Sequence, residues 1–521
     1  MLLLIACGNV AGLLMARSAA RSHELAVRVS LGARPGRLVR QMLTESLTLA
    51  LIGGAAGVLV ARWGSNTLLR LASGSTAAIP LSVPVDAKML LFALGASLLT
   101  GLLFGLAPAI RVHGISLHDA FKAGGRVLGR AGHRLPLGRV LVVVQLALSL
   151  LLMMTAGLFV QTFQNLVGID AGYERERVLS ARIDLSAGGY TSDRLSSLQQ
   201  RLLDAVRAVP GVQSASLSLT GVAGGSMRIS GFAVPGRVLP ADDNNGQENV
   251  VTPEFFETVG ISLIAGRPFG DADRFGAPRV AIISEATAKH FFGTRDVLGA
   301  RFGYGSPPEF EVVGLVRNAR VNNIRETPRR LIFYPLAQRP DEYVTSVEVR
   351  TAQRAETVAL AVKAAIASVD ASIPVREITT LGKLLERGLI RERLVARLGS
   401  AFGIVALLLA GIGLYGVISY SVSRRMSEMG VRLALGASPG RVAEVVLRDA
   451  LLTVAIGLAF GALLSLPAME LVEKLLWGIT PHDSRTLVGA ITALLVVGSV
   501  AGLIPALRAA RVDPVEAIRA E

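Results

Sequence analysis

Long uncharged stretches dominate the hydrophobic pattern of the chain. A helix needs about 20 apolar residues to cross the hydrocarbon core of a bilayer. Five of the seven longest stretches reach this length by themselves, whereas 1–16 and 46–61 reach it only with flanking residues. The pattern predicts a polytopic α-helical membrane protein with about seven transmembrane helices. The seven stretches are 1–16, 46–61, 89–110, 140–169, 398–423, 450–469 and 486–507.

The segment 170–395 has a different pattern, in which short apolar runs alternate with helical spacing and are separated by Gly, Pro and Asp. Helices are predicted at Ser192–Val209 and Arg354–Val369 from their apolar spacing. The alternation and turn residues indicate an inserted α+β domain, with βαβ units as one arrangement. Strands are predicted at Val178–Leu185, Val212–Leu219, Val280–Ile283, Glu309–Val316, Tyr343–Val349 and Pro374–Ile378.

Arginines crowd alternate loops between the uncharged stretches. The loops at 16–45, 111–139 and 421–448 each hold five or six Lys or Arg, whereas the outer loops between them are sparser. Loops rich in Lys and Arg stay in the cytoplasm. These loops are therefore predicted to be cytoplasmic, and residues 170–395 and Met1 extracytoplasmic.

Composition agrees with a membrane protein and argues against a nucleic-acid-binding one. The chain is 51% hydrophobic and 18% charged, with a formal net charge of +15. The basic residues follow the membrane loops and form no groove with interleaved aromatics, so we predict no nucleic acid partner. The single cysteine, Cys7, lies in an apolar stretch and is expected to be a packing residue.

Two cytoplasmic loops share one sequence. Residues 23–47 and 427–451 align without a gap, with eleven of 25 positions identical. The similarity resumes at Pro108-Ala-Ile-Arg111 and Pro505-Ala-Leu-Arg508. The chain therefore contains two homologous three- or four-helix units, a common way to build a transport pathway. Only the second unit is preceded by a crossing and an external domain, so we expect a corresponding helix and domain to be encoded before Met1.

No constellation of residues indicates catalysis or metal binding. The chain has no Gly-x-x-x-x-Gly-Lys-Ser/Thr sequence, and Gly436-Ala-Ser-Pro-Gly-Arg441 lacks the lysine that reaches phosphate. His290 has no second ligand at metal-binding spacing, and Asp242–Asn245 lacks the terminal Glu of a calcium loop. We therefore predict no enzyme activity, no cofactor and no metal in this chain.

Several motifs resemble the MacB/FtsX-type permeases of ABC transporters. In the second unit these are Gly411-Ile-Gly-Leu-Tyr-Gly, Glu428-x-Gly-Val-Arg-Leu-Ala-Leu-Gly-Ala437 and Asp513-Pro-Val-Glu-Ala517. In the external segment they are Val251-Thr-Pro-Glu-Phe-Phe and Gly266-Arg-Pro-Phe269. The chain is most similar to the large duplicated form with two fused units, but lacks its first helix and first periplasmic domain.

The resemblance divides the chain into five parts and implies its partners. It implies a separate cytoplasmic ABC ATPase, expected as a dimer, and a multi-pass location in the bacterial inner membrane with lipid around the helices. A periplasmic adaptor or outer-membrane channel is a further partner that it leaves open. The parts are a first FtsX-like unit at 1–122, a basic cytoplasmic linker at 123–139, a transmembrane helix at 140–169, a periplasmic MacB-like core domain at 170–395 and a second FtsX-like unit at 396–521.

The repeated loops are the predicted contact with the ATPase. Each is amphipathic and cytoplasmic, which suits a surface that meets a soluble partner. In the alternative interpretation, the Glu and Arg four residues apart only support a helix. The resemblance also allows a regulator that switches a periplasmic partner without transport, while a membrane-bound enzyme is disfavoured. The predicted coupling residues are Glu24, Arg28, Gly32, Ala33, Glu428, Arg432, Gly436 and Ala437.

Overall fold

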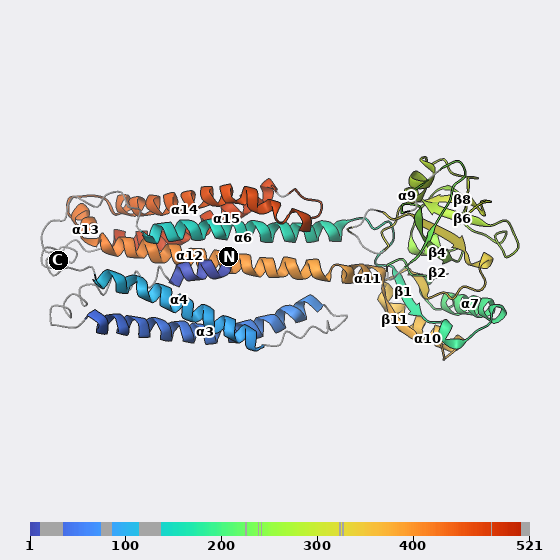
Figure 1. The fold of residues 1–521 in the computed structure, drawn as a ribbon, viewed down its shortest axis with the longest axis horizontal. Helices are drawn as coiled ribbons and strands as arrows, with labels where there is room; N and C mark the ends of the chain where they lie inside the picture. Colours follow the sequence, from blue (N-terminus) through green and yellow to red (C-terminus); the bar gives the residue numbers. More distant parts are fainter. Residues whose placement is uncertain are drawn as a thin grey trace. The chain divides into compact units, whose positions relative to one another are not determined.

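The chain forms two units, Met1–Gln164 with Arg391–Glu521 and Asn165–Ile390. Figure 1 labels the helices and strands of each unit. The computed structural model describes residues 1–10, 35–73, 86–113, 137–223, 227–237, 239–240, 242–321, 325, 328–480 and 482–511.

The first unit is helical. Its short helix α13 (Met426–Ala434) separates two long ones, and a 3-10 turn covers Glu473–Leu475. A helix over residues 2–10 opens the chain. The long helices are α3 (Pro35–Ser73), α4 (Ala87–His113), α6 (Leu137–Gly168), α12 (Ile390–Arg424), α14 (Pro439–Glu470) and α15 (Ser484–Ala510).

Among the described residues, five helices are long and apolar enough to cross a membrane. They lie in α3, α6, α12, α14 and α15. The predicted span 89–110 falls in α4, whose described apolar part is the shorter Ala87–Leu99. The predicted span 1–16 begins as a helix and continues outside the described residues. The structure therefore supports about five spans where the hydrophobic pattern predicts seven.

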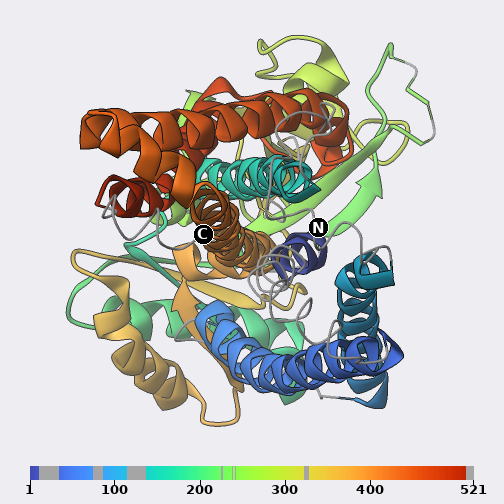
Figure 2. The same cartoon turned by 90° about the vertical axis from the view of Figure 1, so that its left-hand side faces the viewer.

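Helices α6, α12, α14 and α15 share one apolar core, to which α13 also contributes. Helices α3 and α4 pack on each other as an antiparallel pair, coloured blue in Figure 2. Small residues allow the core helices to approach closely: a Cβ at Gly461 of α14 would lie 2.9 Å from the Cα of Ala147 on α6. Close backbone approach at Gly and Ala is the usual packing mode of helices in lipid.

A polar contact ties three helices of this unit together. The side-chain amides of Asn9 and Gln145 both donate to the carbonyl oxygen of Leu409 on α12, at 2.8 and 2.7 Å. Both side chains are buried. Gly413 makes room for them, because a Cβ there would collide with both amide groups. The helix at residues 2–10 is thereby attached to helices of the second repeat.

The second unit is built on an 11-stranded mixed sheet, counted over the described residues. The strand order is β11-β1-β10-β2-β4-β9-β6-β8-β5, with β3 paired to β4 and β7 to β8. The strands are β1 (Val178–Ile183), β2 (Val212–Ser218), β3 (Arg228–Gly231), β4 (Asn245–Val251), β5 (Leu263–Gly266), β6 (Val280–Ser284), β7 (Arg301–Phe302), β8 (Phe310–Val316), β9 (Leu331–Pro335), β10 (Ser346–Thr351) and β11 (Val375–Thr380).

The sheet has two halves joined at a narrow point. Strands β11, β1, β10 and β2 are antiparallel, whereas the other half contains the parallel pairs β4–β9 and β6–β8. Strands β2 and β4 meet at the single register pair Ser218–Val251. The two halves therefore share one short ladder contact and depend on side-chain packing for the rest.

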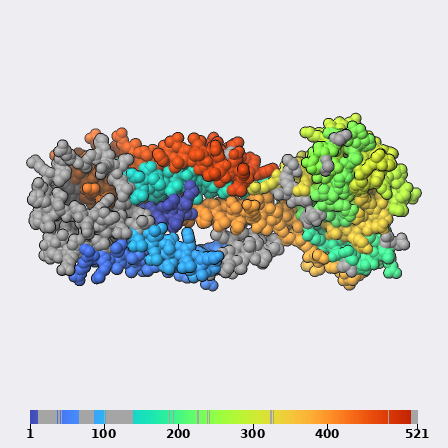
Figure 3. All heavy atoms as spheres, in the orientation of Figure 1, coloured from blue at the N-terminus to red at the C-terminus, as the bar shows by residue number. Residues whose placement is uncertain are grey.

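Helices and two apolar clusters complete this unit, which Figure 3 shows in green to yellow. One cluster buries the apolar sides of α7 and α10 against the sheet, and the other gathers Phe255, Phe256 and Phe333. The helices are α7 (Ser192–Arg207), α8 (Phe255–Val259), α9 (Glu285–Thr287), α10 (Ala359–Val369) and α11 (Leu381–Gly388), with shorter turns at Ser186–Gly188, Ala288–Phe292, Leu336–Gln338 and Ala355–Val358.

The predicted elements of the external segment are confirmed, with ends that shift by a few residues. The predicted helix at 354–369 divides into a 3-10 turn and α10. Strand β4 was not predicted, because its polar residues Gln247, Glu248 and Asn249 are all buried and no apolar alternation marks it. The strand β9, a run of five buried residues, was also missed. The predicted α+β class is confirmed, and its sheet is mixed.

Candidate functional site

The short helix α13 lies between the spanning helices α12 and α14. Glu428 is in its first turn and Arg432 in its last. The helix dipole stabilises a negative charge at the first position and a positive charge at the second. Met429 is buried in the core of the helical unit, and Leu433 packs partly against it. The apolar side of α13 therefore attaches it to α12 and α14.

The opposite side of α13 is exposed and mixes charge with large apolar groups. The Arg432 guanidinium donates to the Glu428 carboxylate at 2.5 Å, between two exposed side chains. Beside them, Val431 is 44% exposed and Leu435 is 82% exposed. An exposed pair of this kind contributes only a few tenths of a kcal/mol. We call Glu428, Val431, Arg432 and Leu435 the α13 face.

Gly436 ends α13 in a conformation that favours glycine. Its φ is +91°, in the left-handed region. The amide of Gly436 donates to the Leu433 carbonyl and that of Ala437 to the Arg432 carbonyl, both at 3.0 Å. This is the Schellman pattern of helix termination. The left-handed Gly436 therefore ends the helix and sets where the α13 face stops.

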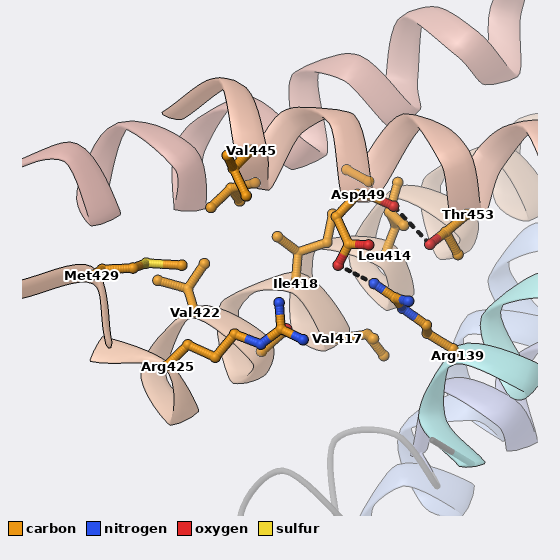
Figure 4. Close-up of a pocket in the computed structure, with 13 residues that line it drawn as sticks. Arg139, Leu414, Val417, Ile418, Val422, Arg425, Met429, Val445, Asp449 and Thr453 are labelled. Atoms are coloured by element: carbon orange, nitrogen blue, oxygen red, sulfur yellow. Dashed lines mark hydrogen bonds and ion pairs between the residues drawn. The ribbon is translucent and has the colours of Figure 1, made fainter. Parts of the chain in front are cut away.

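A small pocket lies beside α13, where α6 begins and α12 ends (Figure 4). Its cavity volume is about 40 Å³. Arg139 of α6 forms an ion pair with Asp449 of α14, and Thr453 donates to the Asp449 carbonyl oxygen. Arg425 and Met429 close the side toward α13, and the remaining walls are mainly aliphatic residues of α12 and α14.

The predicted coupling residues of the first loop lie outside the described residues. These are Glu24, Arg28, Gly32 and Ala33. The structure brings together Glu428 and Arg432, and places Gly436 and Ala437 at the end of the same helix. The role of all eight residues in coupling stays a prediction.

Val431 and Leu435 were not among the predicted site residues. The repeat held the signal, since Val27 and Leu31 occupy the same positions in the first loop and are identical. The ion pair of Arg139 with Asp449 was also missed, although Glu45 places an acid at the position equivalent to Asp449.

The sheet unit holds a buried carboxyl that no motif indicated. Glu348 on β10 is 0% exposed, and the Ser218 hydroxyl donates to its Oε1 at 2.9 Å. Burial raises the pKa of Glu348 to about 7, against the smaller opposing effect of its hydroxyl partners. Within the described residues, no three His, Cys, Asp or Glu side chains gather as metal ligands. We assign no catalytic role to Glu348.

Two family profiles match adjoining parts of the sequence. The FtsX-like permease C-terminal family matches residues 1–117 and 400–514. The MacB-like periplasmic core domain matches residues 140–371, which includes α6 and most of the sheet unit. Together the two profiles account for most of the chain.

Two curated relatives each match about half of the chain. The chain is 27% identical over 288 residues to the macrolide export ATP-binding/permease protein MacB 1/2 of Paracoccus denitrificans, covering 54% of this chain and 42% of that protein. It is 24% identical over 288 residues to the uncharacterized ABC transporter permease YknZ of Bacillus subtilis, covering 54% of this chain and 71% of that protein. The chain thus spans less than half the length of the first of these relatives.

A solved structure is also similar to part of the chain. The periplasmic region of MacB from Actinobacillus actinomycetemcomitans aligns with 43% of this chain and 97% of its own length, at 14% identity and a TM-score of 0.31. The two matched profiles describe permease and periplasmic segments. With its spanning helices and inserted sheet unit, the chain is a multi-pass ABC transporter permease of the MacB/FtsX type that carries FtsX-like segments and a MacB-like periplasmic core domain.

Proposed function

We propose that this permease couples ATP hydrolysis by a separate cytoplasmic ATPase to the export or extrusion of a substrate outside the bacterial inner membrane. The observation that carries the proposal is the exposed α13 face, held between two spanning helices. The match of one permease profile to two segments supports two fused units in this chain. The ATPase, expected as a dimer, would then meet one loop of each unit.

The connectivity of the chain supports a cytoplasmic position for α13. Along the chain, the sheet unit begins at the end of α6 and ends at the start of α12, helices of 32 and 35 residues. At 1.5 Å per residue each is about 50 Å long, more than the roughly 30 Å of a hydrocarbon core. We infer that Leu137 and Arg424, the helix ends away from the sheet unit in the chain, lie on the cytoplasmic side, and α13 follows shortly after Arg424.

The physical chemistry of the α13 face suits a protein partner. Burying an exposed leucine or valine side chain in a partner is favourable by about 1.5–3 kcal/mol. Leu435 and Val431 lie four residues apart and so project from one side of the helix turn. Glu428 and Arg432 frame them with one charge of each sign, which would orient a partner with complementary charges.

The first loop is proposed to do the same for the second ATPase subunit. Glu24, Arg28 and Leu31 are identical to Glu428, Arg432 and Leu435. Gly32-Ala33 of the first loop corresponds to Gly436-Ala437 in sequence. A symmetric ATPase dimer offers two equivalent surfaces, and two equivalent loops in one chain would match them.

Substitution of Leu435 tests the proposal. The full chain would be co-expressed with each ABC ATPase subunit of its source organism in turn, and purified with any ATPase that binds it. Leu435→Asp places a charge in the proposed contact and should lower ATPase affinity by about tenfold or more. Permease-stimulated ATP turnover should fall in parallel.

Leu471→Asp provides the matched control. Leu471 is 84% exposed, as Leu435 nearly is, but follows α14 at its other end. This variant should bind the ATPase as the unmodified chain does. Equal loss in both variants, or full binding by Leu435→Asp, would place the ATPase contact elsewhere.

A further inference from the structure

The pocket beside α13 carries an unbalanced positive charge. Arg139 is neutralised by Asp449, which leaves Arg425 as the second cation in the lining. Among the described residues, no carboxylate and no hydrogen-bond acceptor pairs with the Arg425 guanidinium. An arginine keeps its proton in proteins, so the charge cannot be removed by titration.

The two guanidinium groups converge on one space. Figure 4 shows the side chains of Arg139 and Arg425 extending toward one another past Ile418 and Val417. They come from different helices, α6 and the α12–α13 junction. Asp449 already compensates Arg139, so Arg425 is the cation here whose charge an added anion would compensate.

The size and walls of the pocket restrict the anion. A water molecule needs about 10–15 Å³ of cavity volume measured in this way. The cavity of about 40 Å³ therefore has room for one small group such as a phosphate, and none for a whole lipid or nucleotide. Val445 belongs to the lining and is 46% exposed, so the pocket opens onto the outer surface of α14.

We propose that this pocket binds the phosphate of an anionic phospholipid from the cytoplasmic leaflet. The phosphate would lie against Arg425, and the acyl chains would follow the aliphatic surface of α12 and α14 into the bilayer. Basic pockets between spanning helices on the cytoplasmic side are typical sites for anionic headgroups. The proposal depends on the membrane position of these helices and not on the ATPase contact.

A bound headgroup would contact the start of α13. Met429 of α13 lines the same pocket, and its buried side chain fixes the helix to the core. Arg425 is the residue that precedes α13. Occupancy would thus hold the start of the helix that carries the α13 face, which links lipid composition to the coupling surface.

Native mass spectrometry of the full chain tests the site. The protein would be purified in detergent, incubated with phosphatidylglycerol or with phosphatidylcholine at equal concentration, and the bound lipid counted. One phosphatidylglycerol should be retained in preference to phosphatidylcholine. Arg425→Gln should weaken this retention by about fivefold, the effect of one basic residue on an anionic lipid, whereas Arg425→Lys should largely keep it.

Arg424→Gln is the matched control, because Arg424 is the exposed neighbour on the same helix end and does not line the pocket. It should leave retention unchanged. An equal loss in this variant would overturn the proposal in favour of general surface attraction. Equal retention of phosphatidylcholine would show that charge is not recognised. Displacement of the lipid by millimolar inorganic phosphate alone would show a free-anion site.

Discussion

The two units of this chain pack their interiors in different ways. The sheet unit buries large side chains completely, with Phe255, Phe333 and Tyr334 among its least exposed residues. Their rings contact one another, as Phe255 and Phe333 do with centroids 5.9 Å apart. The helical unit leaves many leucines, valines and phenylalanines on its outer surface and brings backbones together at Gly and Ala.

The difference follows from what surrounds each unit. Water drives large apolar groups into the sheet unit, at about 25 cal/mol per Å² of buried apolar surface. Lipid tails are as apolar as leucine, so a helix surface gains little by leaving them. Association in the helical unit therefore rests on close packing and on polar contacts, such as the amides of Asn9 and Gln145 on the Leu409 carbonyl. Removing a large apolar side chain should consequently destabilise the sheet unit far more than the lipid-facing surface of the helical unit.

The largest effect is expected from Phe255→Ala in the sheet unit. Truncating a fully buried phenylalanine costs about 3–5 kcal/mol. Hydrogen exchange measures local opening of the chain. In β4 and β9 it should become about hundredfold faster. Leu408→Ala on α12, where the leucine is 60% exposed toward lipid, should change exchange of its helix very little. A comparable loss at Leu408 would contradict the distinction between the units.

An intermediate effect is expected from Glu348, a carboxyl group that is fully buried in the sheet unit. Its pKa of about 7, against an ordinary value of 4.5, means that the folded chain holds the proton more tightly than the unfolded chain. The contribution of Glu348 to stability should therefore be fully present below pH 4.5 and fall by about 3 kcal/mol as the pH rises to 7.

Glu348→Gln should remove this pH dependence, because the amide stays neutral and can still accept from Ser218. Exchange protection of β10 and β2, corrected for the intrinsic rate at each pH, provides the measurement. Glu257→Gln, which replaces an exposed glutamate on α8, should leave the slope as it is. A slope that persists in Glu348→Gln would assign the titration to another group.

The smallest effect is expected from adding one methyl group to the helical unit. Gly461→Ala would force α14 away from Ala147 of α6 and cost about 1–3 kcal/mol. Gly489→Ala on α15 meets nothing within 4 Å, and should be neutral or stabilising by up to about 1 kcal/mol, because alanine favours helix. The thermal midpoint in detergent can be followed by tryptophan fluorescence, since Trp63 and Trp477 both belong to the helical unit. Equal shifts would show that close approach at Gly461 does not matter.

Local patterns predicted much of this architecture. Uncharged length identified the spanning helices, and apolar spacing identified α7, β1, β2, β6 and β8 close to their observed ends. The repeat located α13 and its terminal glycine, because helix termination by a left-handed residue is decided within a few residues of sequence. The repeat marked Val431 and Leu435, because they are identical to Val27 and Leu31. Only the structure showed that they lie on the exposed side of α13.

Contacts between distant segments were decided only by the tertiary structure. Arg139 and Asp449 are 310 positions apart, and no local pattern states that α6 begins beside α14. The same holds for the hydrogen bond from Asn9 to the Leu409 carbonyl. It also holds for the polar strand β4, which can be buried because β9 and β3 form hydrogen bonds with its backbone. Sequence determines where a helix or strand is favourable, because those energies are local. Which faces meet, and which charges are left without a partner, depends on how all the elements pack at once.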